Sequence, residues 1–254
     1  MLERHKTSNR PIQPSLKNQN KSAADRLRYF TDRSNEIHRE YLDHPDILDN
    51  YQTFVIWQNN YMLQFYDDFC VTEANTAAVD FVVSELTGIG ISERDHDLAR
   101  VVPAMVAMLP DKALQTIAVA MELNSRILTI NLSICRELFG NLPTENMISE
   151  RNYCLACRQV SRLDEFLELV ELTKQVGQSL NHVVKLPMIG LILRAMRSPA
   201  RLAGFSSLQD FLEVGYHTFK AIKDVDRFLD DISDRTASVF GKIMEEPLEN
   251  LASD

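Results

Sequence analysis

Apolar residues in this chain recur at steps of three and four positions, the spacing that places side chains on one face of an α-helix. Alternating runs of β-branched residues, which would predict strands, are almost absent. Only eight glycines and nine prolines interrupt the 254 residues. The pattern therefore predicts an all-α protein, and the 45% of apolar residues can supply a sizeable core. We expect a single multi-helix bundle of about eight helices.

Composition separates the two ends of the chain from this helical region. Residues 1–21 hold five basic residues against one glutamate, together with two prolines and little apolar mass. Such a segment does not offset the entropy of ordering, and we expect a disordered basic tail. Residues 22–246 are predicted to form the single α-helical domain, and residues 247–254 a C-terminal tail.

Local signals predict several helix boundaries within the domain. Ser22 has the character of an N-cap, and Pro45 suits the first position of a second helix. One long helix is expected from about Ser149 to Val184. Pro103 and Pro199 are expected to end or break the helices in which they fall.

The net charge of the chain and its N-terminal residues indicate which partners and which cellular compartment to expect. The formal net charge of −9 disfavours the phosphate backbone of nucleic acid as a partner. We find no apolar run of about 18 residues, the length of a membrane-spanning helix, and the first residues lack the apolar core of a signal peptide. These features predict a cytoplasmic location, in which the four cysteines would remain thiols.

The stretch "SERDHD" begins a predicted helix and has two interpretations. Ser92 followed by Asp95 is similar to a capping box, and Glu93, Asp95 and Asp97 fall in the first turn. Unpaired backbone N–H groups give that turn partial positive charge, which favours carboxylates. Helix capping therefore accounts for the acidic residues, and it is the interpretation that we favour.

The same stretch also allows a functional interpretation. Glu93 and His96 are three positions apart and share a helix face, as metal ligands do in di-iron bundles. The chain has no second pair of this spacing, and nothing in the sequence brings His217 to His96. The alternative function is a helical-bundle enzyme, or a ligand- or metal-binding protein, with a site around Glu93, Asp95 and His96 and with His217 as a further candidate.

Other chemical motifs are incomplete. Cys154 and Cys157 form a C-x-x-C pair, but no second pair and no βαβ unit accompany it, so we expect two small buried helix residues. Gly88 and Gly90 lack the third glycine of a dinucleotide-binding loop. We therefore predict no metal and no cofactor. The aromatic residues of the second helix are expected in the core: Tyr51, Phe54, Trp57, Tyr61, Phe65 and Phe69.

The segment "VDFVVSELTG" at residues 79–88 resembles the FFLEELY-motif family of uncharacterised bacterial proteins. Phe81, Glu85 and Leu86 match that motif. The resemblance continues in "ERDHDLARVVPAMVAMLPDKAL" and "SPARLAGFSSLQDFLEVGYHTFKAI", and so covers about residues 26–240. It implies a helical protein and assigns no activity, cofactor or catalytic residue.

One segment of this acidic chain carries only positive charges. Between Glu171 and Asp210 there is no acidic residue, while five basic residues occur: Lys174, Lys185, Arg194, Arg197 and Arg201. These charges could pair with acidic helices of the same molecule, or they could bind an anionic partner. We expect the nearby apolar residues to be mostly buried within the domain: Leu186, Ile189, Ile192 and Leu193.

The leading hypothesis is a non-catalytic interaction protein. Its segment 185–205 would bind an acidic protein or an anionic membrane surface through Lys185, Arg194, Arg197 and Arg201. Arginine suits such partners because its planar fork donates two parallel hydrogen bonds.

Overall fold

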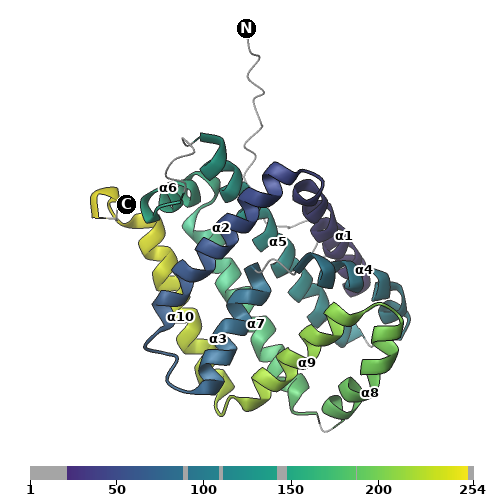
Figure 1. The fold of residues 1–254 in the computed structure, drawn as a ribbon. Helices are drawn as coiled ribbons and strands as arrows, with labels where there is room; N and C mark the ends of the chain where they lie inside the picture. Colours follow the sequence, from purple (N-terminus) through teal and green to yellow (C-terminus); the bar gives the residue numbers. More distant parts are fainter. Residues whose placement is uncertain (1–21, 88–90, 109–110, 142–147, 187, 251–254) are drawn as a thin grey trace.

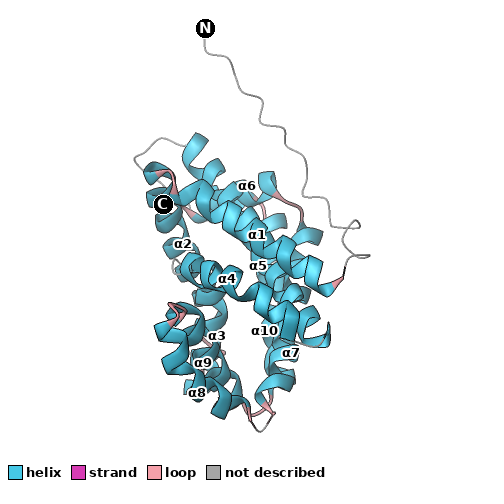
Figure 2. Ribbon diagram, turned by 90° about the vertical axis from the view of Figure 1, so that its right-hand side faces the viewer, coloured by secondary structure: helices cyan, strands magenta, loops and turns pink. Residues whose placement is uncertain are grey.

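The structure is a computed structural model in which helices account for nearly all of the described chain (Figures 1 and 2). The described residues are 22–87, 91–108, 111–141, 148–186 and 188–250. They form ten α-helices and two 3-10 helices, with no strand in these ranges, so the all-α prediction is confirmed with ten helices in place of about eight. The predicted basic tail at residues 1–21 lies outside the described residues.

The α-helices are α1 (Ala23–Leu42), α2 (Pro45–Leu63), α3 (Glu73–Thr87), α4 (Ile91–Met108), α5 (Asp111–Asn141), α6 (Glu150–Val160), α7 (Leu163–Val184), α8 (Ile189–Leu202), α9 (Ser206–Ala221) and α10 (Val225–Glu245). The 3-10 helices are η1 (Gln64–Tyr66) and η2 (Leu248–Asn250). Two predicted starts are confirmed, because the Ser22 hydroxyl accepts from the Asp25 N–H and Pro45 opens α2.

The long helix expected from Ser149 to Val184 is two helices, which corrects the prediction. The backbone is extended at Ser161 (φ −149°, ψ 176°) and at Arg162 (φ −111°, ψ 160°). The Glu165 carboxylate accepts hydrogen bonds from the Ser161 hydroxyl and the Arg162 N–H. A carboxylate that reaches back in this way stabilises a new helix start, and α7 therefore begins at Leu163.

Two prolines lie inside helices that they were expected to end. Pro103 lies within α4 and Pro199 within α8, and both are exposed. Proline removes one backbone hydrogen bond, leaving the carbonyl four residues earlier without its donor. On the solvent-facing side of a helix, water can donate a hydrogen bond to that carbonyl in place of the missing N–H group. This gives a physical reason why both helices continue past their prolines.

Helix α5 is the centre of the molecule (Figure 1). It packs against α1, α2, α3, α6 and α7, and most of the largest hydrophobic cluster surrounds it. By length and composition alone Ala113–Gly140 of α5 could cross a membrane, but 56% of its most apolar window is buried inside the protein. This burial explains why the helix is so apolar. Leu248 in η2 packs on the same cluster, so part of the predicted C-terminal tail contacts the core.

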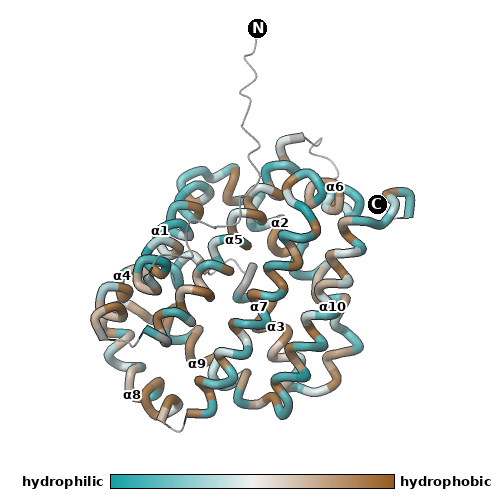
Figure 3. The backbone as a smooth tube through the Cα atoms, turned by 180° about the vertical axis from the view of Figure 1, so that it is seen from behind, coloured by the Kyte–Doolittle hydropathy of each residue, from teal (hydrophilic) through white to brown (hydrophobic). Residues whose placement is uncertain are grey.

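Helices α8 and α9 form a hairpin at the opposite end of the molecule from α6 (Figures 1 and 2). Gly204 makes the turn with φ of +74°, a conformation that favours glycine. Helix α8 packs mainly on α9 and only slightly on α7. Figure 3 shows apolar residues continuing along α8 at the edge of the molecule. The hairpin therefore leaves much of α8 without a protein neighbour.

Candidate functional site

Asp95 is fully buried at the centre of a polar network that joins α1, α4 and α5. Its Oδ2 lies 2.9 Å from His38 Nε2 and accepts from Asn124 Nδ2 at 2.6 Å. Its Oδ1 accepts from Arg94 Nε at 3.1 Å and from Arg94 Nη2 at 3.0 Å. Asn124 also donates to the Ser34 hydroxyl at 3.1 Å. Both carboxylate oxygens thus have two donor groups.

The network continues beyond these first contacts. Arg94 donates to the Glu85 carboxylate at 2.9 Å and to the Asn124 side-chain oxygen at 3.0 Å. His38 Nδ1 lies 2.6 Å from the Tyr41 hydroxyl. Through these bonds the network reaches α3 as well.

Burial and neighbouring charges shift the pKa values of two groups in this network, Asp95 and Tyr41. Burial alone would raise the pKa of Asp95, but the His38 hydrogen bond, the Arg94 charge and the Asn124 amide together hold it below its usual range. Burial and the nearby Asp95 charge raise the pKa of Tyr41, so its hydroxyl stays protonated. The Asp95 carboxylate can only accept, so His38 Nε2 donates to it, while His38 Nδ1 contacts the Tyr41 hydroxyl.

This arrangement is a satisfied structural network. Tyr41 is buried and stacks on Tyr51 with ring centroids 4.5 Å apart, so its hydroxyl is closed to a substrate. The Arg94 charge compensates the Asp95 charge at hydrogen-bond distance. These hydrogen bonds therefore hold α1, α4 and α5 against one another.

The predicted site of Glu93, Asp95 and His96 is not assembled, because its members face opposite sides of α4. Asp95 faces the interior, whereas Glu93 and His96 are exposed and line an open groove of about 870 Å³. This groove runs between α1, α4 and the α8–α9 turn. The predicted cap is also corrected: α4 begins at Ile91, so Ser92 is its second residue and not the N-cap.

His217 lies apart from that groove. It is exposed on α9, nine residues beyond Leu208, whose N–H bonds the Asp97 carboxylate at 3.3 Å. Nine helical residues span about 13 Å. In the described ranges, no group of three or more His, Cys, Asp or Glu side chains could hold a metal ion.

The cysteines and the aromatic face of α2 belong to the core. Cys154 and Cys157 are fully buried within α6, and all four cysteines are free thiols, as predicted. Burial raises the pKa of Cys154 to about 11 and also raises that of Cys157. A neutral buried thiol is a poor nucleophile and a poor metal ligand. Tyr51, Phe54 and Tyr61 are buried, and the other three expected core aromatics are half-buried against the hydrophobic clusters: Trp57, Phe65 and Phe69. Phe65 and Phe69 lie beyond the end of α2 at Leu63, which corrects their assignment to the second helix.

One side of α8 is apolar and exposed. We call it the α8 face, and it comprises Met188 (61% exposed), Leu191 (61%), Ile192 (49%), Met196 (48%) and Leu202 (90%). At 3.6 residues per turn these side chains lie opposite the side that packs on α9. Gly190 marks the packed side, because a Cβ there would lie 2.6 Å from the Tyr216 hydroxyl.

The expectation that the apolar residues of this segment are mostly buried is therefore wrong. Leu186 is 54% and Ile192 49% exposed, while Ile189 and Leu193 are half-buried. The reason is that α8 lies outside the three hydrophobic clusters and has α9 as its main neighbour.

The basic residues of the segment divide into two groups. Arg194 and Arg201 are exposed and seven positions apart, so they share one side of α8. They follow Gly190 by four and eleven positions and therefore lie between the packed side and the Leu191 edge of the α8 face. Arg197 instead points to α9, where its Nε lies 2.6 Å from Glu213 Oε1. The Arg197 guanidinium, with the Gln209 amide, lowers the pKa of Glu213 to about 2. Because α8 continues through Pro199, Arg194 and Arg201 lie on one continuous helix.

Lys185 lies at the other end of the segment. It is the exposed C-cap residue of α7 and lines a hollow of about 460 Å³ together with Lys220 and Lys223. In the described part of the chain, no side-chain ion pair or side-chain hydrogen bond is found for Lys185, Arg194 or Arg201, and these three residues are exposed.

The family model described as Domain of unknown function (DUF8198) matches residues 37–249, and the chain therefore belongs to that family. Comparison with curated proteins and with solved structures gives no significant match.

Proposed function

We propose that this member of the DUF8198 family is a non-catalytic interaction protein that binds an anionic membrane surface through the α8 face. The observation that carries the proposal is the exposed apolar side of α8 beside Arg194 and Arg201. An amphipathic helix with apolar residues on one side and basic residues at its edge is the form that lies in a membrane interface.

The apolar area can supply the attraction. The exposed fractions of the α8 face correspond to about three fully exposed apolar side chains. At about 1.5 to 3 kcal/mol per side chain, their burial would contribute roughly 5 to 9 kcal/mol before the cost of association. After part of it is lost to immobilisation, the apolar contact alone supports weak binding, since a Kd of about 1 mM already requires about 4 kcal/mol.

The charges favour an anionic surface over a neutral one. A basic residue near an anionic membrane contributes about 1 kcal/mol. Arg194 and Arg201 are free for this role, and Lys185 extends the basic edge. Arg197 is left out of the proposed contact because Glu213 already neutralises it.

Shape favours a membrane over an acidic protein. The α8 face is the outer side of a helix at the edge of the molecule, and is therefore convex (Figure 1). A protein partner would need a matching apolar groove, whereas acyl chains adapt to a convex ridge. We therefore treat an acidic protein as the competing outcome of the experiment.

The alternative of a catalytic or metal-binding site has weaker support. Asp95 faces away from Glu93 and His96 and is already paired with Arg94. The relation to the FFLEELY-motif family, a bacterial origin and a cytoplasmic location remain part of the proposal.

The test measures co-sedimentation with vesicles. One set contains phosphatidylcholine alone, and the other contains phosphatidylcholine with 30 mol% phosphatidylglycerol. We expect binding to the anionic set and weaker binding as salt rises from about 0.05 to 0.5 M, because salt screens exposed charges. Arg194→Glu with Arg201→Glu should weaken binding at least about thirtyfold, the equivalent of about 1 kcal/mol for each lost contact.

A matched control reverses two exposed arginines elsewhere. Arg28→Glu with Arg151→Glu makes the same charge change at exposed positions on α1 and α6, outside the α8 face. This variant should bind within about threefold of the natural chain, since long-range screening limits its effect. Equal losses in both variants, or capture by an acidic helical peptide without any vesicle binding, would overturn the proposal.

A further inference from the structure

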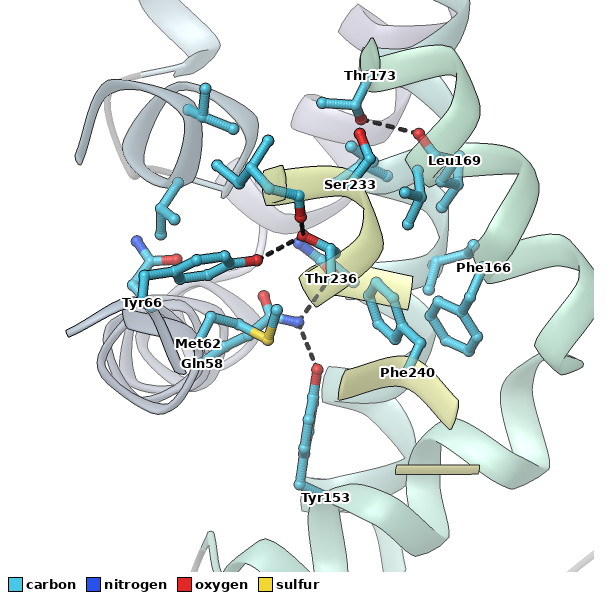
Figure 4. A pocket seen from close by; sticks show the side chains of 18 residues that line it. Gln58, Met62, Tyr66, Tyr153, Phe166, Leu169, Thr173, Ser233, Thr236 and Phe240 are labelled. Carbon is cyan, nitrogen blue, oxygen red and sulfur yellow. Dashed lines mark hydrogen bonds between the residues drawn. The ribbon is translucent and has the colours of Figure 1, made fainter. Parts of the chain in front are cut away.

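A second feature, independent of α8, is a partly open cavity of about 130 Å³ between α2, α3, α5, α7 and α10. Figure 4 shows side chains converging on it from several helices, including Gln58, Phe166 and Thr236. None of the residues that line it is charged, and most are aliphatic or aromatic. An uncompensated charge would be costly there, so only a neutral occupant fits.

Gln58 carries a buried side-chain atom that lacks a hydrogen-bond partner. Its Nε2 donates to Tyr153 Oη at 3.0 Å and to Asn131 Oδ1 at 3.3 Å (Figure 4). Its Oε1 is buried and has no partner among the described residues. If the amide is turned over, the same position holds an unpaired N–H group. Buried polar atoms are nearly always paired, so this atom points to a missing partner.

The remaining polar groups of the lining are mostly engaged. The Thr236 hydroxyl donates to the Ile232 carbonyl at 2.6 Å and lies 2.5 Å from the Tyr66 hydroxyl. The Thr173 hydroxyl donates to the Leu169 carbonyl at 2.8 Å. Asn131 also lines the cavity, and its Nδ2 is buried without a partner among the described residues. The polar demand of the cavity therefore centres on Gln58 and Asn131, which are bonded to each other, while the aliphatic and aromatic walls offer apolar contact.

We propose that this cavity binds a small, neutral, largely apolar molecule with one hydroxyl group, of about the size of phenol. An apolar cavity of about 150 Å³ in another protein accepts benzene. The cavity here is slightly smaller but partly open, so one ring can enter with its edge at the opening. A hydroxyl can donate to Oε1 or accept from Nε2, and it therefore satisfies Gln58 in either amide orientation. The apolar remainder of the molecule fills a space that would otherwise lack van der Waals contacts.

Phenol is the probe for the test, and toluene is its apolar counterpart. The protein should show saturable calorimetric binding of phenol, and phenol at ten times its Kd should raise Tm by about 3 to 6 °C. The side-chain amide signals of Gln58 in ¹⁵N-labelled protein should shift on the same titration. Saturable binding with an unmoved Gln58 signal would place phenol elsewhere and overturn the proposal.

Two variants on α7 test the position of the site. Val170 lines the cavity, and Val170→Phe should abolish phenol binding by filling it. Val183 lies on the same helix but is 39% exposed, so Val183→Phe adds equal bulk outside the cavity and should bind phenol normally. If Val170→Phe does not fold, the Gln58 signals of the natural chain still decide the question.

A third variant tests the polar contact. Gln58→Met keeps the length of the side chain and removes its amide. The ratio of phenol affinity to toluene affinity should fall about tenfold, the usual scale of one hydrogen bond in a buried site. An unchanged ratio, or an absence of phenol binding because water alone occupies the cavity, would refute the inference. Neither result bears on vesicle binding by α8, so the two proposals fail separately.

Discussion

Replacement of Asp95 by asparagine tests the buried network most severely. The change removes one negative charge and places an amide N–H group where Arg94, His38 or Asn124 donates. Loss of one partner of a buried ion pair costs about 3 to 5 kcal/mol. Glu85 still contacts Arg94 at 2.9 Å, so we expect the lower end, about 3 kcal/mol.

Urea denaturation followed by circular dichroism at pH 7 measures this loss. A decrease of about 3 kcal/mol should also lower Tm by about 6 to 12 °C in a chain of this size. Glu93→Gln is the matched control, since Glu93 is exposed on the same helix and should change stability by less than about 0.5 kcal/mol. A loss below about 1 kcal/mol in Asp95→Asn would show that the network does not hold the helices together.

The pH dependence of the free energy of unfolding of Asp95→Asn provides a second test of the network. The pKa of Asp95 is lower in the folded protein than its usual value of about 3.9, so the carboxylate stabilises the fold above that pH. This contribution is lost as pH falls through the folded-state pKa. The stability gap between the natural chain and Asp95→Asn should therefore narrow below about pH 4. A constant gap from pH 7 to pH 3 would contradict the assigned ionisation.

Two further predictions concern helix capping and thiol chemistry. Ser22→Ala should cost about 1 kcal/mol in the free energy of unfolding because Ser22 caps α1, whereas Ser92→Ala should cost less than about 0.5 kcal/mol because Ser92 follows the start of α4. Equal losses in urea denaturation would contradict the assigned caps. At pH 8 a thiol reagent should modify only half-buried Cys70 in the folded protein, because burial raises the pKa of Cys154 to about 11. Rapid modification of two or more thiols without unfolding would show that the α6 cysteines are accessible.

Local sequence signals predicted the helices but not all of their ends. The apolar spacing, the Ser22 cap and Pro45 are properties of neighbouring residues, and the structure confirms them. The break before Leu163 was missed because an apolar stripe continues across it. The glutamate at Glu165, three residues after Arg162, was the available signal of a new helix start.

The network could be predicted only in part, because its members are far apart in sequence. His38 and Asp95 are separated by 57 positions and meet only when α1 packs on α4. Ser34 and His38 do fall on the stripe of α1 that holds Leu27 and Ile37. Two polar residues on an apolar stripe indicate a buried polar contact, although they cannot name its partner.

Local sequence patterns also could not predict that one side of α8 is exposed. An amphipathic segment shows which residues share a face, but the covering neighbour is decided by tertiary packing. The sequence therefore predicted burial for Ile192, which is 49% exposed. It likewise could not assign Arg197 to Glu213, because that pair forms only when α8 and α9 fold back on one another.

The depth of α8 in a membrane tests the central claim most directly. A nitroxide attached through Leu191→Cys reports whether the α8 face enters lipid, and Cys70→Ser removes the half-buried native thiol. The other native cysteines are buried: Cys135, Cys154 and Cys157. With phosphatidylglycerol vesicles we expect the label to become more accessible to oxygen and less accessible to a water-soluble nickel chelate, while a label at Arg151→Cys on α6 stays in water. Unchanged accessibility at position 191 would contradict membrane binding through the α8 face.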